Sequence, residues 1–105
     1  MRKNVLQEKS YDFALRIINL YRFLVKDKEE SVLSKQVLRS GTSIGANVEE
    51  AIGAISEKDF TAKVSIAQKE ARETHYWLRL LRDSEYLTEK QSESIIDECE
   101  ELIKL

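Results

Sequence analysis

This chain contains no proline and only three glycines, so it has little of the turn chemistry on which β-hairpins and β-sandwiches depend. Residues that favour helices are abundant instead, among them glutamate, lysine, arginine, leucine, isoleucine and alanine. A length of 105 residues supplies one hydrophobic core and little material for a second. The sequence therefore predicts an all-α fold in a single domain, residues 1–105.

Cysteine and histidine each occur once, which removes most metal and nucleophile chemistry. Cys99 has no partner for an internal disulfide and cannot build a zinc site. A di-iron bundle needs Glu-x-x-His on two helices, and the residue three before His75 is Arg72. As a general base, His75 lacks a nucleophile and an orienting acid. We therefore predict no metal, no cofactor and no enzymatic activity.

No apolar run approaches the roughly 20 residues that span a bilayer, and residues 1–5 lack the apolar core of a signal peptide. We expect a cytoplasmic protein without a membrane partner. The net charge of −2 is unevenly distributed. Residues 1–30 carry seven Lys/Arg against five Asp/Glu, residues 31–82 carry eight against six, and residues 83–105 carry two against eight. The acidic charge thus belongs to the last segment.

Apolar residues that recur every three or four positions predict four amphipathic helices. The first covers residues 10–26, and the second covers residues 31–55 with Ser31 as its N-cap. The third and fourth begin at capping-box patterns, residues 56–59 and 88–91. Short connections between such helices predict an antiparallel up-down-up-down four-helix bundle.

The first predicted helix has a wider apolar sector than one seam requires. We expect one series to form the buried face: Tyr11, Ala14, Ile18, Tyr21 and Val25. A second series lies beside it on the helical wheel: Phe13, Ile17, Leu20 and Leu24. The sector therefore leaves apolar surface beyond what a two-helix contact covers.

All three glycines lie in residues 39–53, where the apolar residues still keep a helical period. One sector of this helix holds Val37, Gly41, Ile44, Gly45, Val48, Ile52 and Ile55. Each glycine costs roughly 1 kcal/mol of helix propensity relative to alanine. We therefore expect Gly41 and Gly45 to permit close approach by another helix. The alternative is a break between two short helices over residues 40–45.

The third predicted helix carries two apolar stripes. The first, expected to face the core, consists of Phe60, Val64, Ala67, Ala71, Thr74 and Leu78. The second consists of Ala62, Ile66, Trp77 and Leu80. A small monomeric bundle needs one stripe per helix, so the second predicts contact with another chain, with Trp77 as its anchor.

A polar ladder runs along the second helix opposite its apolar sector: Arg39, Ser43, Asn47 and Glu50. At this spacing the side chains can hydrogen-bond to each other or to a neighbouring helix. Either they are simply solvated, or they form the polar part of a subunit seam or a ligand groove. We place them in an oligomer interface with Ile66, Trp77 and Leu80.

The remaining side of the third helix is basic. Lys69, Arg72 and Arg79 could contact phosphates while Tyr76 stacks on a base, and repetition around an oligomer would extend the patch. A pI near 5.5 is low for a dedicated nucleic-acid binder. Binding of RNA or DNA is therefore the alternative to a purely structural role.

Several segments carry a family resemblance, with the pattern Arg-Ser-x-x-Ser-Ile-x-Ala-Asn-x-x-Glu at their centre. These segments are residues 38–51, 58–60, 66–67, 69–74 and 77–78. The chain resembles the bacterial four-helix-bundle proteins named after the intervening sequences of 23S ribosomal RNA genes, over about residues 10 to 104. The resemblance implies an antiparallel bundle that assembles as a ring, a homopentamer.

The same resemblance implies a partner for the second stripe of the third helix. Relatives include the accessory protein of diversity-generating retroelements, which looks like a basic pentamer that works with a reverse transcriptase and RNA. The signature positions correspond here to Arg39, Ser43, Asn47 and Glu50, which we interpret as assembly residues and not as catalytic ones.

Overall fold

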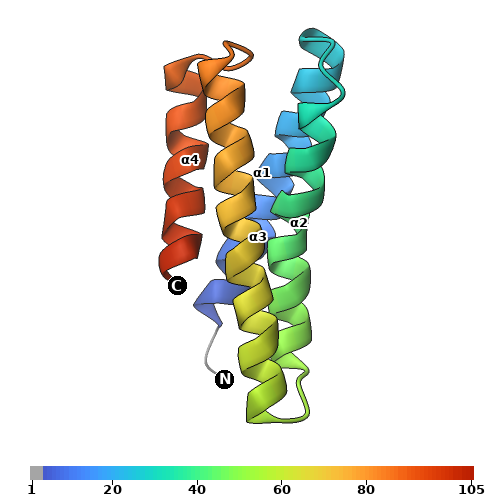
Figure 1. Cartoon of the computed structure of the whole chain (residues 1–105), viewed down its shortest axis with the longest axis vertical. Helices are drawn as coiled ribbons and strands as arrows, with labels where there is room; N and C mark the ends of the chain where they lie inside the picture. The colour runs from blue at the N-terminus through green and yellow to red at the C-terminus, as the bar shows by residue number, and fades with distance from the viewer. Residues whose placement is uncertain (1–3) are drawn as a thin grey trace.

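In the computed structural model, which describes residues 4–105, all regular structure is α-helical. The helices are α1 (Val5–Asp27), α2 (Leu33–Ile52), α3 (Glu57–Asp83) and α4 (Glu89–Lys104). Figure 1 shows the chain running up α1, down α2, up α3 and down α4. The predicted all-α four-helix bundle is confirmed. Within the described residues, no helix combines the length and the apolar character needed to cross a membrane.

The core is one column of apolar side chains to which all four helices contribute. Its buried members are Phe13, Ile17, Leu24, Val37, Ile44, Val48, Ala67, Ala71, Leu78, Leu81, Leu87, Ile95, Ile96, Cys99 and Leu102. The expected buried face of the first helix is wrong: Tyr11 is 61% exposed and Val25 37%. The neighbouring series with Phe13, Ile17 and Leu24 faces inward instead.

The two central glycines of α2 explain why the series with Phe13, Ile17 and Leu24 faces the core. A Cβ at Gly41 would lie 2.8 Å from Cγ1 of Ile17, and one at Gly45 would lie 3.3 Å from the carbonyl oxygen of Ser10. Because neither glycine has a side chain, α1 can approach α2 closely here, with Ile17 against Gly41 and Ser10 against Gly45. The prediction that the glycines serve packing is confirmed. The alternative break over residues 40–45 is wrong, since α2 runs unbroken from Leu33 to Ile52.

The predicted cap of α2 is also wrong. Ser31 is exposed and does not cap the helix, whose N-cap position is Val32. The carboxylate of buried Glu30 accepts hydrogen bonds from the backbone N–H groups of Val32 (3.0 Å), Leu33 (2.8 Å) and Ser34 (2.7 Å). One carboxylate thus satisfies three donors that have no partner within the helix.

The starts of α3 and α4 follow the predicted patterns. Ser56 Oγ accepts from the Asp59 N–H at 3.0 Å. Thr88 and Gln91 form both halves of a capping box, at 3.0 Å and 2.9 Å. In the connection between these helices, Leu87 is buried in the core and Glu85 adopts a φ of 69°.

The hairpin of α2 and α3 projects beyond α1 and α4 at the lower end of the molecule (Figure 1). Its tip therefore lacks a covering layer. Ile52, Ile55 and Phe60 were expected to face inward and are 44%, 97% and 46% exposed. That expectation is wrong because the apolar period of the hairpin continues past the ends of the helices that could cover it.

Candidate assembly and nucleic-acid surfaces

The single histidine and cysteine take structural positions. His75 Nε2 lies 2.9 Å from Glu100 Oε2, which joins α3 to α4. Cys99 Sγ donates to the carbonyl oxygen of Ala71 at 3.2 Å, and burial raises the pKa of the thiol to about 12. Within residues 4–105 no three of His, Cys, Asp or Glu come together in a way that could hold a metal ion.

Arg39, the first member of the polar ladder, joins α2 to α3. Its guanidinium pairs with Glu73, lies 3.6 Å from Glu70 and donates to Gln36 at 3.3 Å. The indole Nε1 of Trp77 donates to the same carboxylate of Glu73 at 3.0 Å. The hydrogen bond from Trp77 holds the pKa of Glu73 below its usual value; burial opposes this shift and Arg39 supports it.

The rest of the ladder is also engaged within the chain. Ser43 Oγ donates to the carbonyl oxygen of Arg39 at 2.6 Å, and Asn47 Nδ2 donates to that of Ser43 at 2.8 Å. Glu50 forms an ion pair of 3.0 Å with Lys63 of α3. The ladder is therefore a polar strip along the seam between α2 and α3.

The apolar residues predicted for the interface lie on α3 beside this strip. Lys63, Ile66, Glu70, Glu73 and Trp77 follow one another at spacings of three and four, so they share a side of the helix. Ile66 is 41% exposed. Trp77 is half-buried against the core, and Leu80 is half-buried one turn further along. The fold thus gathers the predicted assembly residues on one α2/α3 face.

The predicted nucleic-acid residues lie on the adjoining outer side of α3. Lys69, Arg72, Tyr76 and Arg79 are all exposed. The guanidinium carbon of Arg79 lies 5.9 Å from the centre of the Tyr76 ring, and that ring meets Trp77 edge-on at 5.1 Å. No ion pair joins Lys69, Arg72 or Arg79 to another described residue. The structure therefore presents three cations and one exposed aromatic ring along one side of α3.

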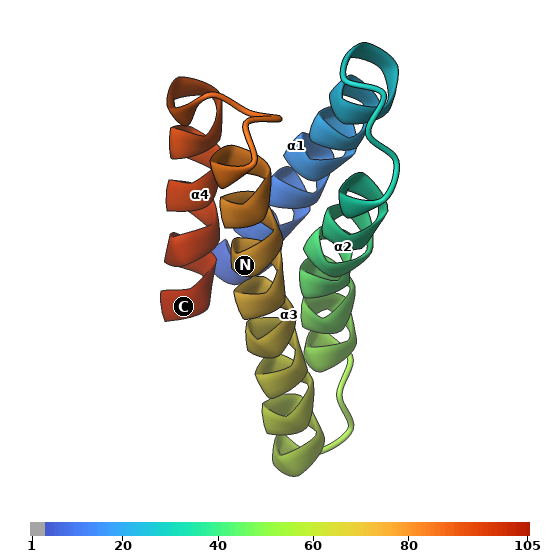
Figure 2. The ribbon, with the colours of Figure 1, turned by 45° about the horizontal axis from the view of Figure 1, so that its top comes forward.

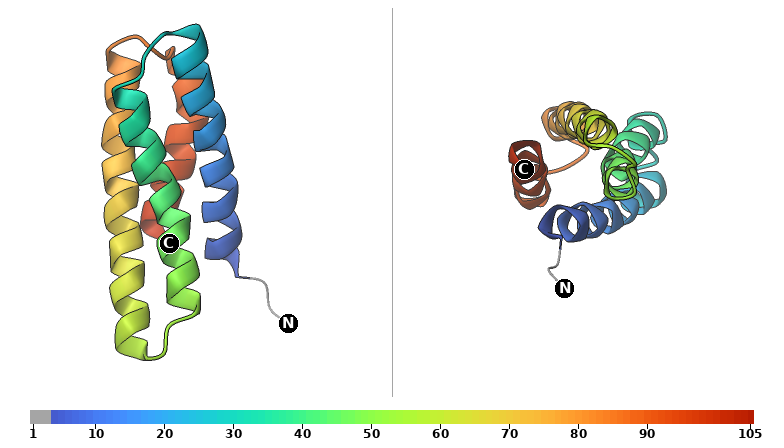
Figure 3. Two further views of the ribbon diagram at one scale, coloured as in Figure 1. Left: turned by 90° about the vertical axis from the view of Figure 1, so that its right-hand side faces the viewer. Right: turned by 90° about the horizontal axis from the view of Figure 1, so that it is seen from below.

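A groove between α1 and α4 was not foreseen in the sequence. These two helices touch each other less than any other neighbouring pair, and α1 leans away from α4 toward the top of the molecule (Figure 2). Viewed from below in Figure 3, α1 and α4 lie next to each other on one side of the bundle. Only the tilt of two helices distant in sequence creates this groove, so helical periodicity could not reveal it.

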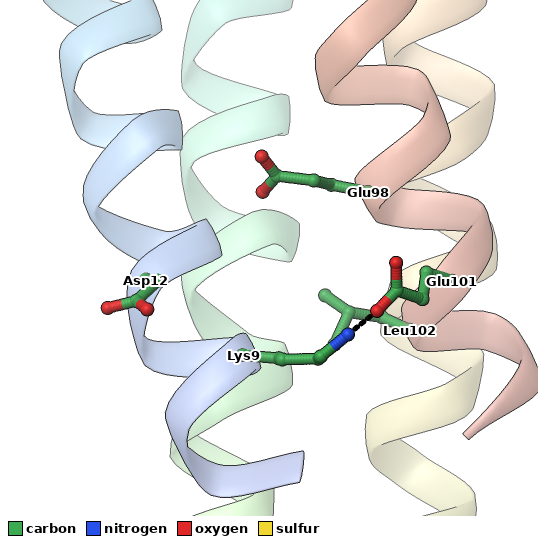
Figure 4. A pocket seen from close by; sticks show the side chains of 5 residues that line it. All are labelled: Lys9, Asp12, Glu98, Glu101 and Leu102. Carbon is green, nitrogen blue, oxygen red and sulfur yellow. Dashed lines mark ion pairs between the residues drawn. The ribbon is translucent and has the colours of Figure 1, made fainter. Parts of the chain in front are cut away.

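The groove has a polar and an apolar part. The polar hollow, of about 220 Å³, is lined by Lys9, Asp12, Glu98, Glu101 and Leu102 (Figure 4). The apolar hollow, of about 280 Å³, is lined by Arg16, Asn19, Leu20, Phe23, Leu87, Gln91 and Ile95. Ion pairs from Lys9 to Glu101 and from Arg16 to Glu98 cross the groove.

A family model described as 23S rRNA-intervening sequence protein matches residues 2–105. The chain belongs to this family. A solved structure of a relative, a protein of unknown function from the S23 ribosomal protein family of Bacteroides thetaiotaomicron, is 56% identical over 95% of this chain and 93% of that one. The two structures superpose with a TM-score of 0.94, so the relative has the same four-helix bundle. No curated protein matches. The predicted family is confirmed.

Proposed function

We propose that this intervening-sequence protein is a non-enzymatic, self-assembling bundle whose working form is a homopentamer. The observation that carries the proposal is the apolar surface left on α1 and α3 once the core is complete: Tyr11, Leu15, Val25, Ile66 and Tyr76. The number five comes from the family resemblance. The bundle serves as a scaffold that presents the same surface several times.

The energetics favour assembly over scattered exposure. Burying one large apolar side chain fully contributes about 1.5–3 kcal/mol. Association costs about 4–15 kcal/mol in lost freedom of motion, so several such side chains must be covered together. Rows on α1 and α3 meet that requirement, whereas an isolated exposed residue such as Val32 does not.

Light scattering coupled to size-exclusion chromatography tests the proposal, with an oligomer expected at micromolar concentration. Ile66→Asp should weaken assembly about tenfold or more, because 1.4 kcal/mol of lost burial already corresponds to a factor of ten. Ile55→Asp, at the fully exposed hairpin tip, is the matched control and should leave the mass unchanged. A wild-type monomer would refute the proposal.

Trp77→Ala provides a second measure of the α2/α3 face. It should reduce the oligomer, and circular dichroism must show that the helices persist, because Trp77 also packs on the core and binds Glu73. An oligomer that is unchanged in this variant would remove Trp77 from the interface.

A nucleic-acid accessory role, alongside an enzyme such as a reverse transcriptase, is the second candidate. It is favoured by the exposed cations Lys69, Arg72 and Arg79, which share one side of α3 with Tyr76. Binding to structured RNA should weaken as salt rises, since phosphate contacts release counterions. Replacing the three cations with alanine should flatten that dependence, whereas Lys35→Ala with Lys58→Ala should not. Absence of binding at low salt would exclude this role.

A further inference from the structure

The outward side of α1 carries a packing pattern that the bundle does not cover. Spacings of three and four residues alternate along it, as in a helix that packs along another helix, and none of its members is buried: Tyr11, Ala14, Ile18, Tyr21 and Val25. These five residues form the outer stripe of α1. Tyr11 is 61% exposed, because the core is built from the other apolar series of α1. The outer stripe therefore indicates a helix partner outside the chain.

The outer stripe faces away from α4 and borders α2. It lies opposite Lys9 and Arg16, which pair with α4. Ser10 and Ile17, which pack on the glycines of α2, adjoin it. Seen from below in Figure 3, α2 lies between α1 and α3. The outer stripe and the second stripe of α3, which includes Ile66, are therefore on two different faces that flank α2.

Two different faces that meet at α2 suit a head-to-tail contact. Such a contact turns each copy relative to the one before it, and the series closes into a ring when the rotation closes. The axis of that ring lies on the α2 side of the bundle, because the two faces converge there.

Contacts within the chain fix the relative heights of the two stripes. Ile17 of α1 packs against Gly41 of α2, and the neighbouring Ser40 lies 2.9 Å from the hydroxyl of Thr74 on α3. Ile17 and Thr74 are therefore level, and their height is the reference level. Figure 1 shows that α1 and α3 both run upward. In a ring whose axis follows the bundle, all copies stand at one height, so the register of the contact is imposed.

In the imposed register the two stripes coincide. Tyr11 lies six residues below the reference level and Ile66 eight below it, a difference in height of about 3 Å at 1.5 Å per residue. Val25 lies eight residues above the level and Leu80 six above it, again about 3 Å apart in height. Each end of the outer stripe thus meets an apolar end of the α3 stripe.

A charged pair lies at the edge of the same contact. Asp12 and Lys69 are each five residues below the reference level, and neither forms an ion pair with a residue that the structure describes. Figure 4 shows the Asp12 carboxylate turned away from α4. The other cations of α3, Arg72 and Arg79, share a side with His75, which contacts α4, so they lie outside this contact.

The two faces also have opposite charges in excess. On the α2/α3 face, the carboxylates of Glu70 and Glu73 share the guanidinium of Arg39, which leaves one negative charge over. Arg22 follows Tyr21 beside the outer stripe, is exposed, and has no ion pair with another described residue. Opposite charges on two surfaces favour their encounter over contacts between identical surfaces.

We propose that the outer stripe of α1 in one copy of this chain packs on the second stripe of α3 in the next copy, at the same height, in a ring with α2 innermost. Tyr11 then meets Ile66, and Val25 meets Leu80. Asp12 pairs with Lys69 at the edge. The inference rests on the self-assembly proposed above and names the two surfaces that meet.

Cysteine cross-linking tests the pairing and its register. Cys99 is buried and its pKa is raised, so the cysteines introduced by Tyr11→Cys and Ile66→Cys are the reactive thiols of the variant. Oxidation with copper phenanthroline should convert a chain that carries both changes into a ladder of covalent multimers. The matched control pairs Tyr11→Cys with Leu80→Cys, which lies about 21 Å further along α3 than Ile66, and should give no ladder.

The single variants distinguish a head-to-tail contact from a two-fold one. Tyr11→Cys alone and Ile66→Cys alone should stay uncross-linked, because each cysteine then faces a different surface. A covalent dimer of Tyr11→Cys alone would show that α1 meets α1 of a second copy, and would overturn the pairing.

Charge reversal supplies the complementary measurement, read by light scattering. Asp12→Lys alone and Lys69→Glu alone should each weaken assembly about fivefold, because like charges then face each other, and the two together should restore it. Asp12→Lys combined with Arg79→Glu is the control and should restore nothing. A wild-type oligomer that gives no ladder and shows no rescue would overturn the pairing and leave self-assembly standing. A wild-type monomer would overturn both.

Discussion

The two seams of α2 and the seam between α1 and α4 are built on opposite plans. On one side of α2, Gly41 and Gly45 allow α1 to approach until a methyl group no longer fits. On the other side, Thr74 Oγ1 lies 2.9 Å from the buried hydroxyl of Ser40, and the Arg39 network covers the outside. The α1/α4 seam keeps two hollows that ion pairs span. The bundle is thus closed around α2 and open at the opposite side.

The closely packed seams of α2 contribute stability, whereas the α1/α4 seam has space at the surface. A seam closed by small residues and direct side-chain contact has no room for a partner. Two exposed ion pairs cross the α1/α4 seam, and each such pair contributes only about 0–1 kcal/mol, so a partner that displaced them would cost the bundle little. The chain is therefore packed most closely around α2, and its α1/α4 side is the more open one.

The largest loss of stability is expected from a substitution in the closely packed α1/α2 seam. In Gly41→Ala the new Cβ lies 2.8 Å from Cγ1 of buried Ile17, and overpacking of this kind costs about 1–3 kcal/mol. Helix propensity returns roughly 1 kcal/mol. The free energy of unfolding should fall by up to about 2 kcal/mol, measured by urea denaturation followed by circular dichroism.

Gly53→Ala is the control for this change. The nearest atoms to a Cβ at position 53 lie at 3.9 Å, so the substitution meets no obstacle. Its stability should be equal to the wild type or higher. If both alanine variants lost the same stability, the close approach of α1 to Gly41 would not be the cause.

A smaller effect is expected where α2 begins. Burial raises the pKa of Glu30, but hydrogen bonds from the backbone of Leu33, Ser34 and Val32 outweigh it and lower that pKa below 4.5. The carboxylate's contribution is therefore complete above pH 4.5 and lost as the pH falls through the lowered value. Glu30→Ala should cost about 1–2 kcal/mol at neutral pH, as loss of a cap does.

The pH profile separates this cap from a general helix effect. The stability difference between wild type and Glu30→Ala should shrink on acidification below pH 4.5, measured by thermal unfolding across that range. The exposed neighbour is the control, and Glu29→Gln should change little at any pH. A difference that stays constant down to strongly acidic pH would contradict the assignment of Glu30 as the cap.

The smallest losses of stability are expected from two arginine substitutions, which compare the α2/α3 seam with the α1/α4 seam. Arg39→Ala should cost about 1 kcal/mol, because Glu73 then loses its cation while it keeps the hydrogen bond from Trp77. Arg16→Ala removes a comparably exposed arginine from the open seam and should cost about 0.5 kcal/mol or less. Hydrogen exchange adds a local measure. In Arg16→Ala, but not in Arg39→Ala, the backbone amides of α4 should exchange faster than those of α3. Equal losses would argue against the difference between the seams.

Much of the fold was predictable because its signals are local. A capping pattern such as Thr88 to Gln91 acts within one turn, and a glycine such as Gly41 that interrupts no apolar period indicates close packing. The buried face of α1 was not predictable in the same way. Two apolar series compete there, and the contact of Ile17 with Gly41, residues 24 positions apart, decides between them.

The candidate surfaces also differ in whether local sequence signals or contacts between helices determine them. The grouping of Ile66, Trp77 and Leu80 follows from helical spacing on α3 and needs no tertiary information. The engagement of Arg39 with Glu73 does need it, since the pair joins two helices. Ser31 failed as a cap because Glu30, which has no standard capping signature, bends its longer side chain back over the first turn of α2.

The uncovered end of the α2–α3 hairpin gives the molecule a direction. Ile52, Ile55 and Phe60 gather at the α2–α3 turn, whereas the opposite pole, at the α1–α2 turn, exposes only the smaller side chains Val25 and Val32 among the described large apolar residues of that turn. A ring of identically oriented subunits would therefore have one rim more apolar than the other. Such a ring would bind a flat apolar surface through the rim that carries the α2–α3 turns, and its other rim would stay exposed to solvent.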